Sequence, residues 1–465
     1  MDGSDLPEIL RDALKSIEGQ FTVDTAKLKQ ISQRFEEELR EGLEKDGRNI
    51  AMNITWVIGF PSGHEEGQYL TVDLGGTNLR TCMVTLRGRD RETEVDQEFT
   101  RLPDKIKTGT AEELWRLVAD AIGDFITKRN IRASADKPIP LGFTFSYPAM
   151  QERIDHGVLT TWTKGFEIKG VEGQDVVAQL EDEIAKRNLP VKIVALINDT
   201  TGAMIASAYK DPKTIIGAIF GTGCNAAYME NLDSIPKLKT DLPPHTPIAI
   251  NCEYGAFDND HRVLPRTKYD KAIDEESPKP GEQTFEKMSA GLYLGEIYRQ
   301  IMCDFYDRGL VFVGQDVSEL KKPYSLDTAF LSCLENDSLE ERNARFQSVL
   351  GFNPTAEEMT LSQRLAELIA VRGARLCTCG IAAICRMKGI KSGHVAADGS
   401  VANKHPTFKA RWAGALGEVL DWPKDRESDP IVLTSAEDGS GVGAAVIAAM
   451  AMKKRNESEV VGQRK

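Results

Sequence analysis

The sequence predicts an α/β protein in which one strand–turn–strand unit occurs twice. A run of β-branched and other apolar residues at 191–197 is typical of a strand buried on both faces of a sheet. Two other predicted strands run into glycine turns, one at Gly75-Gly76 and one at Gly221-Thr222-Gly223, and a further strand follows each turn. We therefore expect a duplicated architecture with one glycine turn in each domain.

The composition is that of an ordinary globular protein. The chain has 465 residues, 41% of them hydrophobic and 28% charged, and this length predicts two to three domains. A net charge of −13 without a long basic tract argues against nucleic acid or an anionic membrane as a partner. No run approaches 18 apolar residues, so no membrane span is expected. Eight scattered cysteines are typical of free thiols in a reducing, cytoplasmic location, and the protein is expected to be a monomer or a homodimer.

Polar residues follow the buried run directly, at Asn198-Asp199-Thr200. Open α/β sheets bind ligands beyond the carboxyl ends of their strands, so Asp199 is a candidate catalytic base. The alternative is that Asp199 caps a helix that starts near Thr201, because Asp is a favoured N-cap residue. Taken alone, this stretch favours the capping role, and the rest of the chain has to decide between the two.

The first glycine turn joins predicted strands at 68–74 and 78–86. Glycines at the turn allow backbone N–H groups to approach an anion closely. Asp73 lies just before the turn and is suited to hold Mg²⁺ through water. The alternative is a plain hairpin that binds no ligand.

The second glycine turn matches the pattern G-x-G-x-x-A at residues 221–226, which also occurs in dinucleotide-binding proteins. That fingerprint normally opens a helix, whereas the residues after Ala226 continue as a strand. We therefore predict strand, glycine turn and strand here, and a nicotinamide-dependent dehydrogenase is the weaker hypothesis.

Other polar positions lie at the ends of further predicted elements. A strand at 138–145 leads into Ser146-Tyr147-Pro148, and a strand at 248–253 ends in a carboxylate, Glu253. Glu286 lies near the start of one helix that is expected to run from 285 to beyond 297. Amphipathic or apolar patterns predict helices at 24–45, 111–129 and 361–385. Strands are expected at 394–398 and 431–435, and a helix of small residues at 439–452.

Taken in order, the motifs resemble those of the superfamily that contains actin, heat-shock chaperones and sugar kinases. The motifs are Asp73-Leu-Gly-Gly-Thr-Asn78, Asn198-Asp199-Thr200, Phe220-Gly-Thr-Gly223, Asp398-Gly-Ser400 and Asp438-Gly-Ser-Gly441. Five further stretches are similar to hexokinases of the fungal type: Leu141-Gly-Phe-Thr-Phe-Ser-Tyr-Pro148, Trp162-Thr-Lys-Gly-Phe166, Ile250-Asn-Cys-Glu-Tyr-Gly255, Phe257-Asp258-Asn259 and Leu264-Pro-Arg-Thr-Lys-Tyr-Asp270. The similarity runs from about residue 25 to residue 455.

This resemblance implies two ribonuclease-H-like domains, as in actin-like ATPases, with mixed sheets flanked by helices and ATP in the cleft between them. The small domain is expected to comprise residues 64–198 and 442–465, and the large domain residues 1–63 and 199–441.

The resemblance also implies roles for individual residues. Asp199 is expected to be the catalytic base, assisted by Lys164, and Asp73 to lie near Mg²⁺. The residues that match the sugar-binding set are Ser146, Pro148, Thr163, Lys164, Asn198, Asp199, Gly223, Asn225, Glu253 and Glu286. Those that match the ATP-binding set are Asp73, Gly75, Gly76, Thr77, Asn78, Thr222, Gly399 and Ser400.

The implied reaction is transfer of a phosphoryl group from ATP, with Mg²⁺, to the 6-hydroxyl of glucose, fructose or mannose, as in the first step of glycolysis. The alternative is a sugar-sensing relative with little catalysis, although such relatives usually lack part of the polar set. Tyr147 stands where many members have Phe, and Cys224 and Ala226 also depart from the common fungal pattern. The preference among the three sugars stays open.

Overall fold

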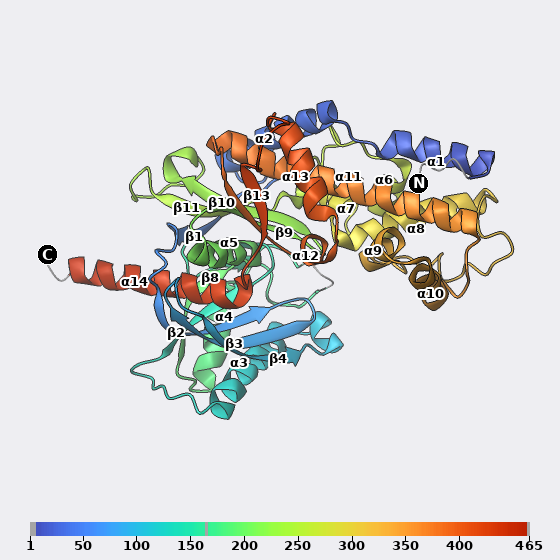
Figure 1. The fold of residues 1–465 in the computed structure, drawn as a ribbon. Helices are drawn as coiled ribbons and strands as arrows, with labels where there is room; N and C mark the ends of the chain where they lie inside the picture. Colours follow the sequence, from blue (N-terminus) through green and yellow to red (C-terminus); the bar gives the residue numbers. More distant parts are fainter. Residues whose placement is uncertain (1–5, 163–165, 463–465) are drawn as a thin grey trace.

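A computed structural model describes residues 6–162 and 166–462, without the side chains of residues 456–462. Two β-sheets lie on either side of a central pair of helices, α5 (Asp199–Lys210) and α14 (Ala444–Gly462), as Figure 1 shows. We call the five-stranded sheet the small sheet and the six-stranded sheet the large sheet.

The small sheet has the strand order β4-β3-β2-β5-β8. Its strands are β2 (Glu66–Leu74), β3 (Asn78–Arg87), β4 (Glu94–Arg101), β5 (Ile139–Phe145) and β8 (Val191–Ile197). Strands β2, β3 and β4 are antiparallel to one another, whereas β2, β5 and β8 are parallel. Helices α3 (Ala111–Lys128) and α4 (Val176–Lys186) pack on it over an apolar core. The parallel strands all end at one edge, which brings the residues after them together.

The large sheet has the order β1-β11-β10-β9-β12-β13. Its strands are β1 (Asn53–Ile58), β9 (Thr214–Phe220), β10 (Cys224–Asn231), β11 (Pro247–Asn251), β12 (Gly393–Asp398) and β13 (Ile431–Ser435). Helices α2 (Thr25–Glu44), α11 (Ala356–Lys388) and α13 (Phe408–Val419) belong to its core. Apart from β1, three antiparallel strands are followed by two parallel ones, as in the small sheet. The predicted duplication is therefore confirmed.

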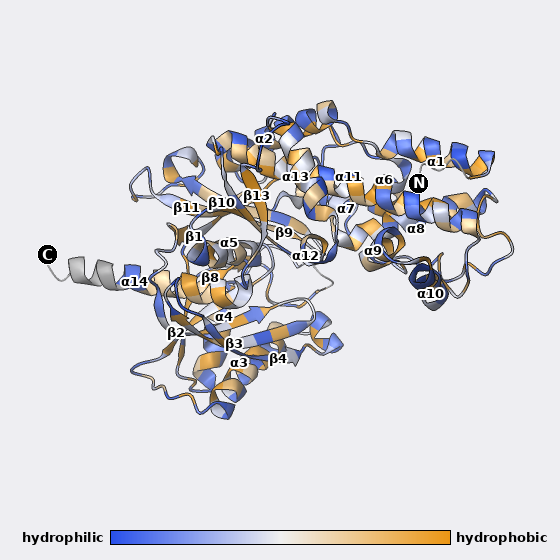
Figure 2. Ribbon diagram, in the orientation of Figure 1, coloured by the Kyte–Doolittle hydropathy of each residue, from blue (hydrophilic) through white to orange (hydrophobic). Residues whose placement is uncertain are grey.

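Small residues let the central helices approach each other closely. A Cβ atom on Gly202 in α5 would lie 2.4 Å from the carbonyl oxygen of Gly439, in the π-helical turn Gly439–Gly443 that precedes α14. The first turns of α14, beside β8, are hydrophobic in Figure 2 and are buried between the sheets. Glycine at positions 202 and 439 therefore allows α5 to pack directly against the turn that precedes α14.

A second group of helices has its own apolar core, at the right of Figure 1. It comprises α1 (Glu8–Phe21), α6 (Lys268–Glu276), α8 (Gly291–Asp307), α9 (Thr328–Asn336), α10 (Leu339–Leu350) and part of α11. The remaining short elements are α7 (Thr284–Ser289), α12 (Ser400–Lys404), β6 (Ala149–Met150), β7 (Val158–Leu159) and the 3₁₀ turns Asp104–Thr108, Leu232–Ser234 and Tyr254–Ala256. Helix α11 is long and apolar enough to cross a membrane, but 83% of its most apolar window is buried inside the protein, as expected for a core helix.

The single helix expected from residue 285 onward is wrong, because α7 and α8 are separate. Ala290 between them has an extended backbone, with φ −86° and ψ 153°. The N–H groups of Gly291 and Leu292 then donate to the carbonyls of Gly221 and Thr222, at 2.8 and 3.2 Å. The break thus attaches the start of α8 to the second glycine turn, a contact that helical periodicity does not reveal.

Candidate active site

The predicted base lies where the small sheet meets the central helices. Asn198 follows β8 and is the N-cap of α5, because its side chain accepts a hydrogen bond from the Thr200 N–H at 2.9 Å. Asp199 is the first helical residue, and its Oδ1 also accepts from this N–H, at 2.7 Å. The hypothesis that Asp199 is the N-cap is therefore wrong by one residue. The Asp199 side chain remains half-buried at the strand end, where a ligand can reach it.

The first glycine turn joins β2 to β3 and is closed by a hydrogen bond from the Gly75 N–H to the carbonyl of Asn78, at 3.2 Å. Thr77 and Asn78 are exposed, and Asp73 is half-buried one residue before the end of β2. The turn thus offers short polar side chains and one carboxylate at the edge where β5 and β8 also end.

An ion pair connects the strands of this turn to Asp438, the N-cap of the π-helical turn that precedes α14. Arg80, which lies opposite Asp73 in the β2–β3 ladder, donates from Nη1 to Oδ1 of Asp438 at 2.8 Å. Burial alone would lower the pKa of Arg80, but the hydrogen bond to Asp438 and the nearby charge of Asp73 raise it overall. Asp438 also accepts from the N–H of Gly441, at 2.9 Å. No local pattern in the sequence indicates a role for Arg80, because its partner Asp438 lies far along the chain.

The second glycine turn joins antiparallel strands β9 and β10, and the Gly221 N–H donates to the Gly223 carbonyl at 3.0 Å. Thr222 at its tip is exposed. Because a strand follows the turn, the helix required by the dinucleotide fingerprint is missing from this described segment. Gly399 packs on the turn with φ +108°, and a Cβ atom there would lie 2.5 Å from the Phe220 carbonyl carbon. Ser400 begins α12 beside this contact and is exposed.

Polar side chains at the ends of β10 and β11 form a connected network. Nδ2 of Asn225 donates to Oδ1 of Asn251 at 2.7 Å, and Nδ2 of Asn251 donates to Oε1 of Glu253 at 2.7 Å. The N–H of Glu253 returns a hydrogen bond to Oδ1 of Asn225 at 2.9 Å. Nδ2 of Asn225 also reaches Oγ1 of Thr200, next to Asp199, at 3.2 Å. Asn251 lies within the motif Ile250-Asn-Cys-Glu-Tyr-Gly255 but is not among the predicted site residues, and its place in that motif is the signal that could have found it.

Glu286 lies against the second glycine turn. Its Oε2 accepts from the N–H of Cys224 at 3.0 Å, and a Cβ atom on Gly223 would lie 2.5 Å from the same oxygen. Burial and the charge of Glu286 raise the pKa of the Cys224 thiol, which keeps it protonated. Gln283 precedes α7 with φ +56°, and Glu253 has φ +57°. Non-glycine residues in this left-handed region are uncommon and gather at functional sites.

The turn after β5 places Ser146 and Pro148, both half-buried, on either side of buried Tyr147. The predicted residues Thr163 and Lys164 lie outside the described part of the chain. The segment before them contacts the opposite part of the protein, because Nζ of Lys279 donates to Oγ1 of Thr161 at 3.0 Å.

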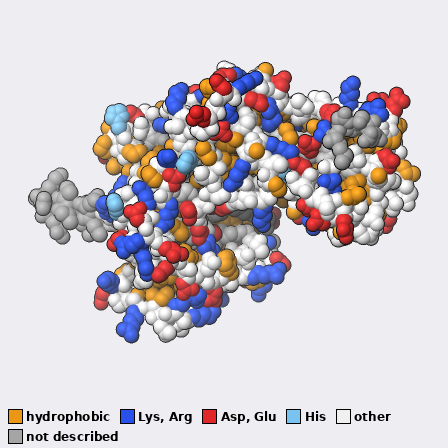
Figure 3. All heavy atoms as spheres, viewed as in Figure 1, with side chains coloured by type: hydrophobic (Ala, Val, Ile, Leu, Met, Phe, Trp, Pro, Cys, Tyr) orange, Lys and Arg blue, Asp and Glu red, His pale blue; other side chains and the backbone are white. Residues whose placement is uncertain are grey.

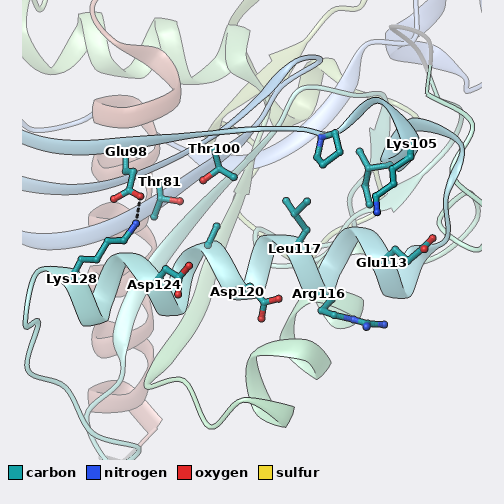
Figure 4. A pocket seen from close by; sticks show the side chains of 13 residues that line it. Thr81, Glu98, Thr100, Lys105, Glu113, Arg116, Leu117, Asp120, Asp124 and Lys128 are labelled. Carbon is teal, nitrogen blue, oxygen red and sulfur yellow. Dashed lines mark hydrogen bonds and ion pairs between the residues drawn. The ribbon is translucent and has the colours of Figure 1, made fainter.

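Two hollows have very different linings. A small cavity of about 10 Å³, roughly the space for one water, is lined in part by Tyr147, Asn198 and Asn251. A larger one of about 650 Å³ lies between β3, β4 and α3 (Figure 4). Of the described site residues none lines the larger hollow, and its Glu98 and Lys128 pair with each other at 2.6 Å. The predicted site residues lie instead at the strand ends, where the surface in Figure 3 is indented between the small sheet and the α9–α10 region.

The fold and the arrangement of strand ends define a two-domain sugar kinase of the actin-like type. Two family models, both described as Hexokinase, match residues 13–209 and 215–450. The chain belongs to the hexokinase family and is an enzyme of that family.

Several relatives cover nearly the whole chain. A hexokinase of Emericella nidulans is 54% identical over 99% of this chain and 95% of its own length. Hexokinase-2 of Saccharomyces cerevisiae is 50% identical over 99% of this chain and 96% of its own. A solved hexokinase of Schistosoma mansoni, complexed with glucose, matches with a TM-score of 0.86 and 33% identity, over 95% of this chain and 99% of that one.

Proposed function

We propose that this hexokinase transfers the γ-phosphoryl group of ATP to the 6-hydroxyl of glucose, fructose or mannose. The products are hexose 6-phosphate and ADP, and the reaction is the first step of glycolysis. The observation that carries the proposal is the position of Asp199. It follows β8 at the same strand-end edge as the first glycine turn, with β5 between them, and it adjoins Thr200, which bonds to the polar network of the large sheet.

The hexose is held by hydrogen-bonding groups from both sides of the site. Asn198 and Ser146 come from the small-sheet side, and Asn225, Glu253 and Glu286 from the large-sheet side. Pro148, Thr163, Lys164 and Gly223 complete the set. Groups already oriented by one another reject a ligand that lacks the matching hydroxyls, because buried polar groups would lose their partners. The glucose bound by the Schistosoma relative supports a hexose as the ligand.

Asp199 accepts the proton of the sugar 6-hydroxyl as that oxygen attacks the γ-phosphorus. The hydrogen bond from the Thr200 N–H fixes one oxygen of the carboxylate and orients the group. Phosphoryl transfer needs positioning and charge stabilisation more than covalent chemistry, and Lys164 together with the two glycine turns supplies these.

The donor set fits a nucleotide with magnesium. Gly75, Gly76, Thr77, Asn78 and Thr222 form the two turns for the phosphates, and Gly399 and Ser400 lie beside the second turn for the adenosine. Asp73 is the carboxylate at the first turn, and carboxylate oxygens with water suit Mg²⁺. When bound, Mg²⁺ supplies neutralisation of the phosphate charge.

The proposed small domain (64–198 with 442–465) and large domain (1–63 with 199–441) close on the sugar before transfer, so that water does not replace it as acceptor. The hinge lies where the backbones of Gly202 and Gly439 touch. The eight free cysteines support a reducing, cytoplasmic location.

A coupled assay for glucose 6-phosphate tests the proposal. Purified protein with ATP, Mg²⁺ and glucose, fructose or mannose in turn is expected to turn over at about 1–100 s⁻¹ with at least one sugar. Glucose binding without turnover on any of the three would instead show the sugar-sensing alternative. A protein that neither binds nor phosphorylates any of the three sugars would overturn both the proposed reaction and the sugar-sensing alternative.

A further inference from the structure

We propose that Tyr147 is a positioning residue that connects the first glycine turn to the sugar-contacting segments. The inference rests on the proposed function and adds a residue for which the family resemblance implies no role. It starts from the contacts of one buried side chain, which is 2% exposed.

The ring of Tyr147 lies in an aromatic cluster. Its centroid is 4.9 Å from that of Phe145 and 4.9 Å from that of Trp162, with an edge-to-face geometry to the latter. Phe166 lies 5.5 Å away. Because Trp162 and Phe166 flank the segment that carries Thr163 and Lys164, the Tyr147 ring anchors both ends of that segment.

The hydroxyl of Tyr147 reaches the other way, to the first glycine turn. It donates a hydrogen bond to the carbonyl oxygen of Gly75, at 3.2 Å. Burial and the charge of Asp73 raise the pKa of Tyr147, so the hydroxyl stays protonated and remains a donor.

This hydrogen bond fixes a whole peptide group. The carbonyl of Gly75 and the N–H of Gly76 belong to one planar trans peptide, so they point in opposite directions. Holding the carbonyl toward the aromatic cluster therefore aims the Gly76 N–H away from it. A glycine turn binds an anion through such N–H groups, so the Tyr147 hydroxyl orients a phosphate-binding donor.

Tyr147 also lies between Ser146 and Pro148, and it lines the small cavity beside Asn198. One side chain thus touches the sugar turn, the aromatic anchors of the 163–165 segment and the phosphate turn. A shift of the ring changes all three together, whereas loss of the hydroxyl leaves the ring in place and removes the hydrogen bond to the phosphate turn.

The test is Tyr147→Phe, which keeps the ring and removes the hydroxyl. We expect the KM for ATP to rise about three- to tenfold, the value of roughly one lost hydrogen bond, while the dissociation constant for glucose stays within twofold. Tyr147→Leu removes the ring as well, so glucose affinity is expected to fall too. Both variants are compared by steady-state kinetics with varied ATP and by equilibrium titration with glucose.

Tyr69→Phe is the matched control, because its hydroxyl also donates to a backbone carbonyl at 3.2 Å, that of Glu66, at the other end of β2. It is expected to leave both constants unchanged. An unchanged KM for ATP in active Tyr147→Phe protein, or an equal rise in the Tyr69→Phe control, would overturn the positioning role. Inactive wild-type protein would instead refute the proposed function, so the two failures are distinguishable.

Discussion

The two glycine turns have the same strand–turn–strand construction but are held by different means. The first is supported by side chains, namely the Tyr147 hydroxyl on Gly75 and the Arg80–Asp438 ion pair. The second is supported mainly by closely packed backbone, since Gly221 contacts Gly399 and accepts a hydrogen bond from the N–H of Gly291. Its side-chain contact is that of Glu286 with the N–H of Cys224, in a space too small for a methyl group on Gly223. The two turns are therefore sensitive to different mutations. The first is sensitive to loss of the side chains that bond to it, and the second to added atoms that its close packing cannot accommodate.

The largest expected difference is between alanine at Gly223 and alanine at Gly75. A methyl group at Gly223 would lie 2.5 Å from Oε2 of Glu286 and displace this carboxylate from the Cys224 N–H. The nearest atom to a methyl group at Gly75 is the Asn78 carbonyl oxygen, at 3.4 Å. We expect Gly223→Ala to raise the dissociation constant for glucose about 30- to 100-fold, by loss of a hydrogen-bonded charged group.

Gly75→Ala serves as the comparison variant, with glucose affinity within about twofold of wild type because its methyl group has room. Thermal melts first establish that both variants are folded. The dissociation constant for glucose is then measured for each by equilibrium titration. Equal glucose affinities in the two variants would contradict the contrast between the turns.

An intermediate effect is expected from the ion pair at the first turn. Asp438→Asn removes the charge that faces Arg80, whose side chain is 17% exposed. Losing a hydrogen bond between charged groups costs about 1.5–3 kcal/mol, so the KM for ATP should rise about tenfold or more while glucose affinity holds.

The control for Asp438→Asn is Glu66→Gln. It breaks the ion pair between Arg91 and Glu66 on the same sheet, where both side chains are about 60% exposed. Exposed pairs contribute little, so this variant should behave as wild type. A KM for ATP that responds equally to both substitutions would show that the Arg80 contact has no special part in the site.

The smallest effect concerns the acid stability of the contact between α9 and the start of α13. Glu335 in α9 pairs with His405 and Arg411, on either side of the start of α13, and these contacts outweigh burial and lower its pKa from 4.5 to about 2. Because the pKa of Glu335 is lower in the folded than in the unfolded protein, its carboxylate stabilises the fold at pH values above about 4.5. This stabilisation is lost as the pH falls from about 4.5 toward 2. Glu335→Gln should therefore show a shallower fall in unfolding free energy across this window, measured by urea denaturation. An identical pH slope would contradict the assignment.

Elements that depend on local pattern could be predicted from the sequence. The buried run at 191–197, both glycine turns and the duplication follow from apolar periodicity and glycine placement. The N-cap was assigned one residue too late, because Asn198 and Asp199 are both good caps and only the hydrogen bonds distinguish them. The break at Ala290 could not be predicted, since it depends on a turn about 70 residues earlier.

The site shows the same division. Asp199, Asn225, Glu253 and Glu286 end or begin predicted elements, and motif resemblance names them. Asn251 lies in one of these motifs but has no predicted role, because its side chain bonds to two other side chains, those of Asn225 and Glu253. Contacts between distant segments of the chain are set by the folded arrangement, so local sequence pattern does not contain them.

The most direct test of the central claim is Asp199→Asn. The amide keeps the shape of the side chain and can still accept from the Thr200 N–H, but it cannot take a proton from the sugar. With kcat and the glucose dissociation constant measured on the same preparation, we predict that kcat falls about 10³-fold while glucose affinity changes less than threefold. A kcat within tenfold of the wild-type value would contradict the account.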